Sequence, residues 1–454
     1  MKENHYFAFV NCTIFDGRVN SEIIPDGVIL IHLKKEGNKK FGYIEKVGKK
    51  SEIEISEKYK IIDLKDKFVI PGLINAHAHL TGDGKPRKIT TKSEKEIKRL
   101  LWIARRWIGK KLIKMMMKRN LKNALNSGVT AIRALGDPYY YDLEIRDEIE
   151  KDKFLGPRLL VAGKALCITG GHGWYMAHVV DSPWEARKAV RENVRKGVDV
   201  IKLISTGGVM DSKRLGEAGR PQMTIEEISA ACDEAHRAGL LVAAHAESIL
   251  GVKEALLGGV DTIEHGADLD EECIKLFKEN PKTLRGYASL IPTLSAPINI
   301  SEWSTKELEM SEIQLQNTLL IKDGIINGFK KAVKNNISIG VGTDATVTFV
   351  THYDFWRELV FMAQYGNLEP KQVIHLATLG NARILGIDNI TGSIEPSKSA
   401  DFVVLNGNVL EDLNYLEKPY MIVIRGRIIN RPKIRKIKKI EKLKRKKENM
   451  KKNK

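Results

Sequence analysis

The sequence predicts an α/β protein, with a (β/α)8 barrel in the middle of the chain and a small β domain built from both ends. Two patterns support this prediction. Short β-rich runs lie near both termini, and apolar strand candidates alternate with helical stretches between them. The middle of the chain holds eight such strand candidates in succession, which favours a closed parallel barrel over an open doubly wound sheet. A chain of 454 residues is long enough for both units.

The small domain is predicted from β-rich runs separated by turn signals such as Asp16-Gly17 and Asp26-Gly27. Neither end supplies enough strands for a stable sheet by itself. We therefore expect one small β-sandwich domain formed by residues 1–67 together with residues 386–430. The runs are Phe7–Ile14, Gly27–His32, Tyr43–Val47, Ala400–Asn406 and Met421–Ile429.

The barrel is expected over residues 68–385, in the TIM-barrel architecture. Its strand candidates are Val69–Leu80, Val129–Leu135, Arg158–Leu166, Asp199–Ser205, Leu240–Glu247, Asp261–Gly266, Leu290–Leu294 and Ser338–Asp344. Helices are expected between them, for example over Thr224–Ala238 and Ile249–Leu257. The lysine-rich stretch Thr81–Asn120 forms either a helical lid or the first outer helix. In such barrels the chemistry lies at the carboxyl ends of the strands.

The formal charge of +18 is concentrated at the carboxyl end. Residues 431–454 contain 14 Lys or Arg and two Glu, so this tail carries +12 and the rest of the chain only +6. We expect the tail to be disordered and solvated, the alternative being a cationic helix with an apolar stripe that lies on a membrane surface. The basic residues thus belong to an appendage, and no specific nucleic-acid partner is expected.

Four widely separated cysteines form no CxxC pair, which argues against a disulfide framework and against a zinc ribbon. We expect each to be a small buried side chain in a reducing cytoplasm. The first residues show no signal peptide, and no stretch reaches the roughly 20 apolar residues that span a bilayer. The expected location is therefore cytoplasmic, without a transmembrane segment.

Metal-ligand residue types stand at the ends of five of the predicted barrel strands. His77 and His79 end the first strand, and because alternate residues of a strand point the same way, both imidazoles can bind one metal ion. Two surface histidines in a loop would be the simpler explanation, but a buried strand precedes them. Lys202 is expensive to bury unpaired and therefore needs a reason. The further strand-end residues are Lys202, His245, His265 and Asp344.

These motifs resemble the amidohydrolase superfamily over roughly residues 5–430. The matching segments are Pro71-Gly72-Leu73-Ile74-Asn75-Ala76-His77-Ala78-His79, Ile201-Lys202, Ala244-His245-Ala246, Glu264-His265-Gly266 and Gly342-Thr343-Asp344-Ala345. Two glycine-rich segments, Thr169–Gly173 and Ser205–Val209, resemble the prolidase-like or imidazolonepropionase-like branch. That branch includes enzymes that hydrolyse dipeptides and N-acyl amino acids, so the resemblance implies a small-molecule amide or dipeptide substrate.

The resemblance also implies a site for two divalent metal ions, expected to be Zn²⁺, although the same ligands suit manganese, cobalt or iron. His77, His79 and Asp344 would bind the first ion, and His245 and His265 the second. Lys202 would bridge the two ions after CO₂ converts it to a carbamate. The ions would share a hydroxide, and Asp344 would act as acid and base by passing its proton to the leaving nitrogen.

Four further side chains are candidates for contacting the substrate. His172 lies in a glycine-rich loop after the third strand and is expected to contact the scissile carbonyl or a substrate carboxylate, a loop-stabilising hydrogen bond being the alternative. Arg133 ends the second strand and is expected to point toward the mouth, where it could pair with an anionic group. Trp174 and Tyr175 form an apolar wall or only pack the loop.

Two other functions remain open at this point. One is a one-metal deaminase or cyclic-amide hydrolase of imidazolonepropionase type, against which Lys202 argues because those relatives usually lack the bridging lysine. The other is a non-catalytic scaffold on the same fold, against which the complete set of ligand types argues. The resemblance further implies association into a homo-oligomer.

Overall fold

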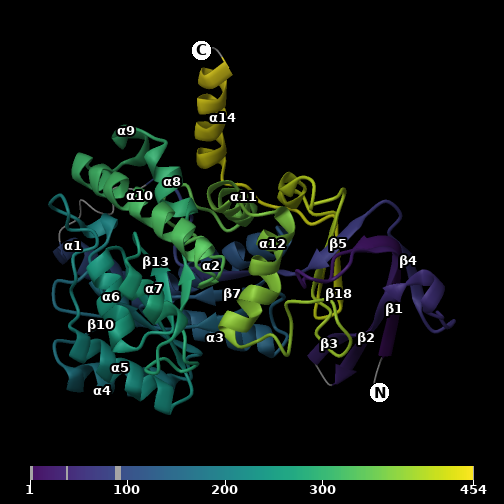
Figure 1. The fold of residues 1–454 in the computed structure, drawn as a ribbon, viewed down its shortest axis with the longest axis horizontal. Coiled ribbons are helices and arrows are strands. Elements are labelled where there is room, and N and C mark those ends of the chain that lie inside the picture. The colour runs from purple at the N-terminus through teal and green to yellow at the C-terminus, as the bar shows by residue number, and fades with distance from the viewer. Residues whose placement is uncertain (1–3, 37–38, 87–93, 453–454) are drawn as a thin grey trace.

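The computed structural model describes residues 4–36, 39–86 and 94–452. A small sheet lies at one end of the molecule and a larger α/β part at the other (Figure 1). The strands of the small sheet are β1 (Asn4–Ile14), β2 (Ile24–Glu36), β3 (Lys39–Lys49), β4 (Lys60–Asp63), β5 (Phe68–Pro71), β16 (Phe402–Leu405), β17 (Met421–Ile424) and β18 (Arg427–Asn430).

The small sheet joins the two ends of the chain, as the sequence predicted. Its order is β18-β17-β16-β5-β1-β2-β3, with β4 paired to β1. Strand β5 pairs in parallel with β1 and antiparallel with β16 and so links all strands into one hydrogen-bonded sheet. Ile44 N donates to Lys398 O and Ala400 N donates to Gly42 O, so the sheet curls until β3 meets the segment before β16, and the sandwich stays a prediction. Phe9 and Phe402, from opposite ends of the chain, meet edge to face with ring centroids 5.0 Å apart in its core.

The α/β part contains two parallel sheets. One has the order β6-β7-β8 and the other β10-β9-β11-β12-β13-β14-β15. Their bounds are β6 (Leu73–Ala78), β7 (Val129–Ala134), β8 (Arg158–Val161), β9 (Ala165–Cys167), β10 (Ala177–Val179), β11 (Val200–Ile204), β12 (Leu241–Ala246), β13 (Thr262–His265), β14 (Ser289–Ile291) and β15 (Ser338–Ile339).

Each of the eight expected strand regions overlaps at least one of these strands, and two regions divide. The third, Arg158–Leu166, contains β8 and the start of β9. The first expected strand, Val69–Leu80, divides at Gly72 into β5 of the small sheet and β6 of the α/β part. A side chain at Gly72 would collide with Thr130, so the chain passes between the two units where only glycine fits. The boundary between the units therefore follows β5.

Backbone hydrogen bonds connect the two parallel sheets at two places. Ala76 N donates to Val341 O at 2.9 Å, and Asp199 N donates to Val161 O at 2.8 Å. The first bond places β6 beside the segment that follows β15, and the second places β8 beside the start of β11. The carboxyl ends of the strands that carry the predicted ligands consequently face a common space.

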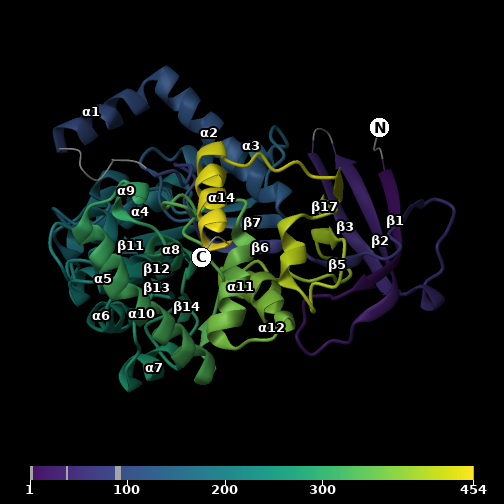
Figure 2. The same cartoon turned by 90° about the horizontal axis from the view of Figure 1, so that it is seen from above.

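Helices cover the outside of these strands (Figure 2). The expected helices over Thr224–Ala238 and Ile249–Leu257 are α5 (Ile225–Arg237) and α6 (Ile249–Gly258). In α5, the Thr224 side chain and Glu227 form a reciprocal capping box that fixes where the helix starts. The helices between β7 and β16 are α3 (Tyr141–Glu150), α4 (Pro183–Lys196), α5 (Ile225–Arg237), α6 (Ile249–Gly258), α7 (Glu271–Lys278), α8 (Ser295–Ser301), α9 (Thr305–Leu308), α10 (Glu312–Lys334), α11 (Phe355–Gly366), α12 (Pro370–His375) and α13 (Asn381–Leu385).

The lysine-rich stretch after β6 forms two helices, α1 (Glu94–Arg105) and α2 (Trp107–Asn126). Residues 87–93 of this stretch lie outside the described part of the chain. The buried residues of α2 all lie from Met117 onward, as expected of an outer helix. In contrast, α1 has no buried residue and lies at the edge of the molecule (Figure 2). Helix α2 therefore fits the outer-helix alternative, and the lid alternative stays a prediction for α1.

The basic tail is helical, so the expectation of disorder is wrong. Helix α14 (Lys438–Lys452) projects from the α/β part (Figure 1). Its Ile440 is fully buried against a cluster that includes Trp303 and Phe349. Lys444 also pairs with Asp354 at 2.6 Å. The apolar stripe recognised in the sequence thus packs on the protein itself, which compensates the entropy lost in ordering the tail.

All four cysteines are buried and unpaired, as predicted. No helix in the described ranges has the length and apolar character needed to span a membrane.

Candidate metal centre

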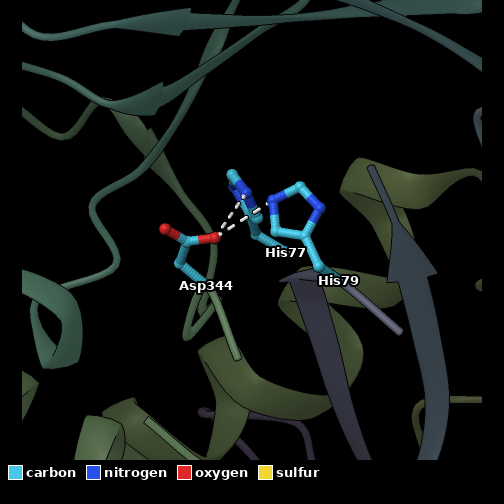
Figure 3. A group of neighbouring side chains, drawn as sticks. All are labelled: His77, His79 and Asp344. Carbon is cyan, nitrogen blue, oxygen red and sulfur yellow. Dashed lines mark ion pairs between the residues drawn. The ribbon is translucent and has the colours of Figure 1, made fainter. Parts of the chain in front are cut away.

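The first ligand group comes from β6 and from the loop after β15. His77 and His79 lie two residues apart at the end of β6 and turn toward Asp344 (Figure 3). His77 Nε2 lies 3.4 Å and His79 Nε2 3.2 Å from Asp344 Oδ1. Burial acts to raise the pKa of Asp344, but the two histidines hold that pKa well below its usual range. The group thus combines two imidazoles with a carboxylate, a donor set that suits a divalent ion.

The second ligand group contains His245, His265 and Glu247. The two imidazole rings meet edge to face with centroids 4.6 Å apart, and His245 Nε2 lies 3.6 Å from Glu247 Oε2. Burial lowers the pKa of both histidines well below the usual value, which favours the neutral form that binds metals. The ring of His77 lies 5.1 Å from that of His265, so the two groups adjoin.

Lys202 lies on β11 with only 3% of its surface exposed. Its Nζ has no hydrogen-bond partner among the described residues, and burial lowers its pKa to about 8. An isolated ammonium is costly in such a place, whereas a neutral amine or its carbamate is not. The buried position is therefore compatible with the carbamate that the family resemblance implies.

Buried polar atoms without hydrogen-bond partners gather in this region. Within the described part of the chain they are His77 Nε2, His79 Nδ1, Lys202 Nζ, Glu247 Oε2 and Asp344 Oδ1. Native proteins leave few such atoms unsatisfied, so a cluster of them calls for a ligand. Coordination of divalent ions would satisfy His77 Nε2 and the two carboxylate oxygens together, whereas His79 turns Nε2, and not Nδ1, toward Asp344. The residues present therefore fit a two-metal site.

Arg133 does not reach the mouth, and its expected contact with substrate is wrong. The side chain is 1% exposed, and its Nη2 donates to Glu264 Oε1 at 2.7 Å. The other carboxylate oxygen of Glu264 lies 2.7 Å from His77 Nδ1. Burial acts to raise the pKa of Glu264, but Arg133 lowers it strongly and keeps the carboxylate charged. Arg133 thus orients His77 through Glu264. Residues that hydrogen-bond to metal ligands commonly fix the ligands in this way.

His172 lies against the second ligand group, with its ring centroid 4.9 Å from that of His245. Its Nδ1 lies 2.7 Å from Asp211 Oδ2. Burial acts to lower the pKa of His172, but Asp211 raises it above the usual value. A Cβ at Gly208 would come within 2.5 Å of His172 Nε2, so this glycine leaves room for the ring. Trp174 and Tyr175 follow on the short helix η2 (Trp174–Met176).

Sequence reasoning missed three residues of the centre: Glu247, Glu264 and Asp211. The alternation that singled out His77 and His79 also applies to His245 and Glu247, so the signal for Glu247 was present. Glu264 had no such signal, because it directly precedes His265 and neighbouring strand residues normally point to opposite faces. His265 adopts a left-handed backbone with φ of 70°, which brings both side chains to the centre.

The arrangement of the metal-ligand residues agrees with the proteins that this chain resembles. The sequence profile of the amidohydrolase family matches residues 68–429. The chain belongs to the amidohydrolase family. Ochratoxinase from Aspergillus niger is 28% identical over 329 residues, which span 67% of this chain and 65% of that protein. A 5'-deoxyadenosine deaminase from Methanosphaera stadtmanae is 22% identical over 84% of this chain and 81% of its own length.

Solved structures of this family superpose on nearly the whole chain. A Bifidobacterium longum protein described as a candidate prolidase is 38% identical, with a TM-score of 0.83 over 97% of this chain and 98% of that one. A Xaa-Pro dipeptidase with methionine bound in its active site is 29% identical, with a TM-score of 0.77 over 94% of this chain and 100% of that one. The structural neighbours therefore include the prolidase-like proteins that the glycine-rich segments resembled.

Proposed function

We propose that the chain is a binuclear metal-dependent hydrolase that cleaves the C–N bond of a small amide, such as a dipeptide or an N-acyl amino acid. The two parallel sheets would form one closed (β/α)8 barrel with the metal centre at its mouth. The observation that carries the proposal is the cluster of unsatisfied buried polar atoms around two adjoining ligand groups. The prolidase-like neighbours support the amide substrate.

His77, His79 and Asp344 would hold the first ion, and His245 and His265 the second, with Lys202 as a bridging carbamate between them. Glu247 offers a further oxygen to the second ion. Zn²⁺ suits this mixture of nitrogen and oxygen ligands. Bound there, the ions would polarise the scissile carbonyl and lower the pKa of a water molecule.

Asp344 holds and moves the proton in this proposal. Its carboxylate is charged, and its Oδ1 faces both histidines of the first group. It would accept a proton from the attacking water and deliver it to the leaving nitrogen. His172, whose pKa Asp211 raises against the effect of burial, would donate from Nε2 to the carbonyl oxygen or to a substrate carboxylate. Arg133 and Glu264 keep His77 oriented throughout.

A one-metal deaminase is the second candidate, favoured by the likeness to 5'-deoxyadenosine deaminase. It would use one metal group and leave the buried Lys202 without a role. The absence of a partner for Lys202 Nζ among the described residues therefore speaks for the two-metal hydrolase. A non-catalytic scaffold is the third candidate. It does not explain why two complete groups of metal-ligand residues are present.

The test is hydrolysis by protein reconstituted with Zn²⁺, Mn²⁺ or Co²⁺ in bicarbonate buffer. Dipeptides and N-acyl amino acids are offered, and the released amino acid is quantified by chromatography. Asp344→Asn should lower kcat by about 10²-fold or more. The exposed Asp323→Asn on α10 is the matched control and should retain full activity. The proposal is refuted if the fully metal-loaded protein hydrolyses no compound of the panel, or if it deaminates nucleosides instead.

A further inference from the structure

A hollow of about 530 Å³ lies between the body of the molecule and the start of α14, where that helix leaves the α/β part (Figure 1). Three segments that are far apart in the sequence form it: the loop after β6, the second half of α2 and residues 435–439. Its volume is within the range of small-molecule sites. Apart from Ile437, every residue that lines the hollow is a cation: Lys85, Arg119, Arg435, Lys436, Lys438 and Lys439.

The tail segment that supplies four of these cations is held in place by buried groups of the body. Asn123 on α2 accepts a hydrogen bond from Arg435 N and donates one to Arg435 O, both at 3.0 Å. Asn126, on the same helix, donates to Lys433 O at 2.7 Å. Both asparagines are at most 6% exposed, and Ile440 in the first turn of α14 is fully buried. The hollow is therefore a fixed feature of the fold and not one arrangement of a loose tail.

The two cations from the body share one carboxylate. Asp83 is buried, and its Oδ2 lies 2.8 Å from Lys85 Nζ and 3.9 Å from Arg119 Nη2. The second distance is too long for a hydrogen bond, and 46% of the Arg119 side chain is exposed. One carboxylate cannot neutralise two cations, so this side of the hollow carries a net positive charge.

Two of the four cations from the tail have no carboxylate partner. Arg435 and Lys438 make no ion pair within the residues that the structure describes. The other two, Lys436 and Lys439, pair with glutamates at 2.9 and 2.8 Å. Holding like charges close together raises the energy of the folded chain unless an anion compensates them. The hollow thus combines fixed walls, ligand-sized volume and uncompensated positive charge.

We propose that this hollow binds a small soluble ligand with several charged oxyanion groups, of the polyphosphate type. The guanidinium groups of Arg119 and Arg435 can each bind two phosphate oxygens, and the lysines add point charges around them. The ligand would connect the tail to α2 and to the loop after β6. No residue that lines the hollow belongs to the candidate metal centre, so this inference stands whether or not the chain hydrolyses amides.

A long polyanion would use a different surface. A nucleic-acid strand or an anionic membrane would extend beyond the hollow and contact the exposed cations further along α14, among them Lys442 and Arg445. The lining cations instead come from three segments and meet at one hollow. Substitutions inside the hollow and along α14 therefore separate a small ligand from a long one.

The first experiment is a calorimetric titration of the full-length protein with sodium triphosphate in about 0.15 M chloride, which screens diffuse surface charge. It is run before and after metal removal, because triphosphate also chelates metal ions. We expect saturable binding of one triphosphate per chain that persists without metals and weakens about tenfold or more in Arg119→Gln/Arg435→Gln. The matched control, Lys442→Gln/Arg445→Gln, removes the same charge outside the hollow and should bind as the wild type does. No saturable binding, or an equal loss in both double variants, would overturn the proposal.

The second experiment measures hydrogen exchange in the tail by mass spectrometry, with triphosphate or with sodium chloride at the same ionic strength. Triphosphate should slow exchange over residues 433–447 in the wild type, because it ties the tail to the body. Arg119→Gln should reduce this protection although Arg119 lies on α2, which a ligand held by the tail alone would not require. Equal protection by the salt would overturn the proposal. So would binding of single-stranded RNA or phosphatidylglycerol vesicles that depends on Lys442 and Arg445, if triphosphate does not bind.

Discussion

The ion pair between Arg133 and Glu264 provides a quantitative test of how the metal centre is held. Its atoms are 2.7 Å apart, and the two side chains are 1% and 0% exposed. Arg133→Met leaves Glu264 as a buried carboxylate without its cation, which should cost about 3–5 kcal/mol of the free energy of unfolding. Glu264→Gln strands Arg133 in the same way and should cost a similar amount.

The double variant separates the pair from its surroundings. Arg133→Met/Glu264→Gln buries no stranded charge and keeps an acceptor for His77 Nδ1, so it should lose less than the two single variants added together. We expect a coupling of about 1–3 kcal/mol. The four proteins are unfolded in urea after metal removal, and tryptophan fluorescence and circular dichroism are followed together. Arg191→Met, which breaks a pair whose arginine is 65% exposed, is the control and should cost about 1 kcal/mol or less.

Additive losses, or a cost for Arg133→Met no greater than that of Arg191→Met, would refute this reasoning. Zinc affinity gives a second measurement on the same proteins. Because Glu264 orients His77, Glu264→Gln should weaken zinc binding about 10- to 100-fold in competition with a chelator. Unchanged affinity would show that His77 needs no such support.

Three further predictions follow from other parts of the molecule. Burial raises the pKa of Asp137 from 3.8 to about 6, so its stabilising contribution is present below about pH 4 and is lost as pH rises through about 6. Asp137→Asn should therefore gain up to about 3 kcal/mol relative to wild type between pH 4 and pH 8 in urea denaturation, and a constant difference would contradict this. Ile440→Ala should cost about 2–5 kcal/mol and expose the tail to proteolysis, whereas the exposed Lys446→Ala should cost under about 0.5 kcal/mol. Gly208→Ala should displace His172 and lower kcat/KM about 10- to 100-fold with little change in stability, and full activity would show that the ring position is unimportant.

The strand-end ligands could be predicted because they follow a simple periodicity. His77 and His79 alternate on one strand, and His245, His265 and Asp344 end apolar runs whose carboxyl ends meet. The succession of parallel strands in the α/β part was also predictable, but the order β10-β9-β11 was not, because β10 lies outside the eight expected strands. Periodicity carries this information because a parallel sheet places equivalent strand ends side by side.

The errors arose where tertiary contacts override local pattern. Arg133 ends its strand like a ligand, but it turns into the interior because Glu264 pairs with it there. The tail has the composition of a disordered segment, yet the stripe around Ile440 is covered by Trp303 and Phe349. In both cases the deciding partner lies more than 90 residues away in the sequence.

The central claim is that the chain holds two metal ions bridged through Lys202, and metal content by plasma mass spectrometry tests it most directly. Wild-type protein and Lys202→Met are purified without chelator in bicarbonate buffer and then reconstituted with Zn²⁺. We predict about two ions per chain in the wild type and about one in the variant. One ion in the wild type would favour the deaminase, and none after reconstitution would contradict the account altogether.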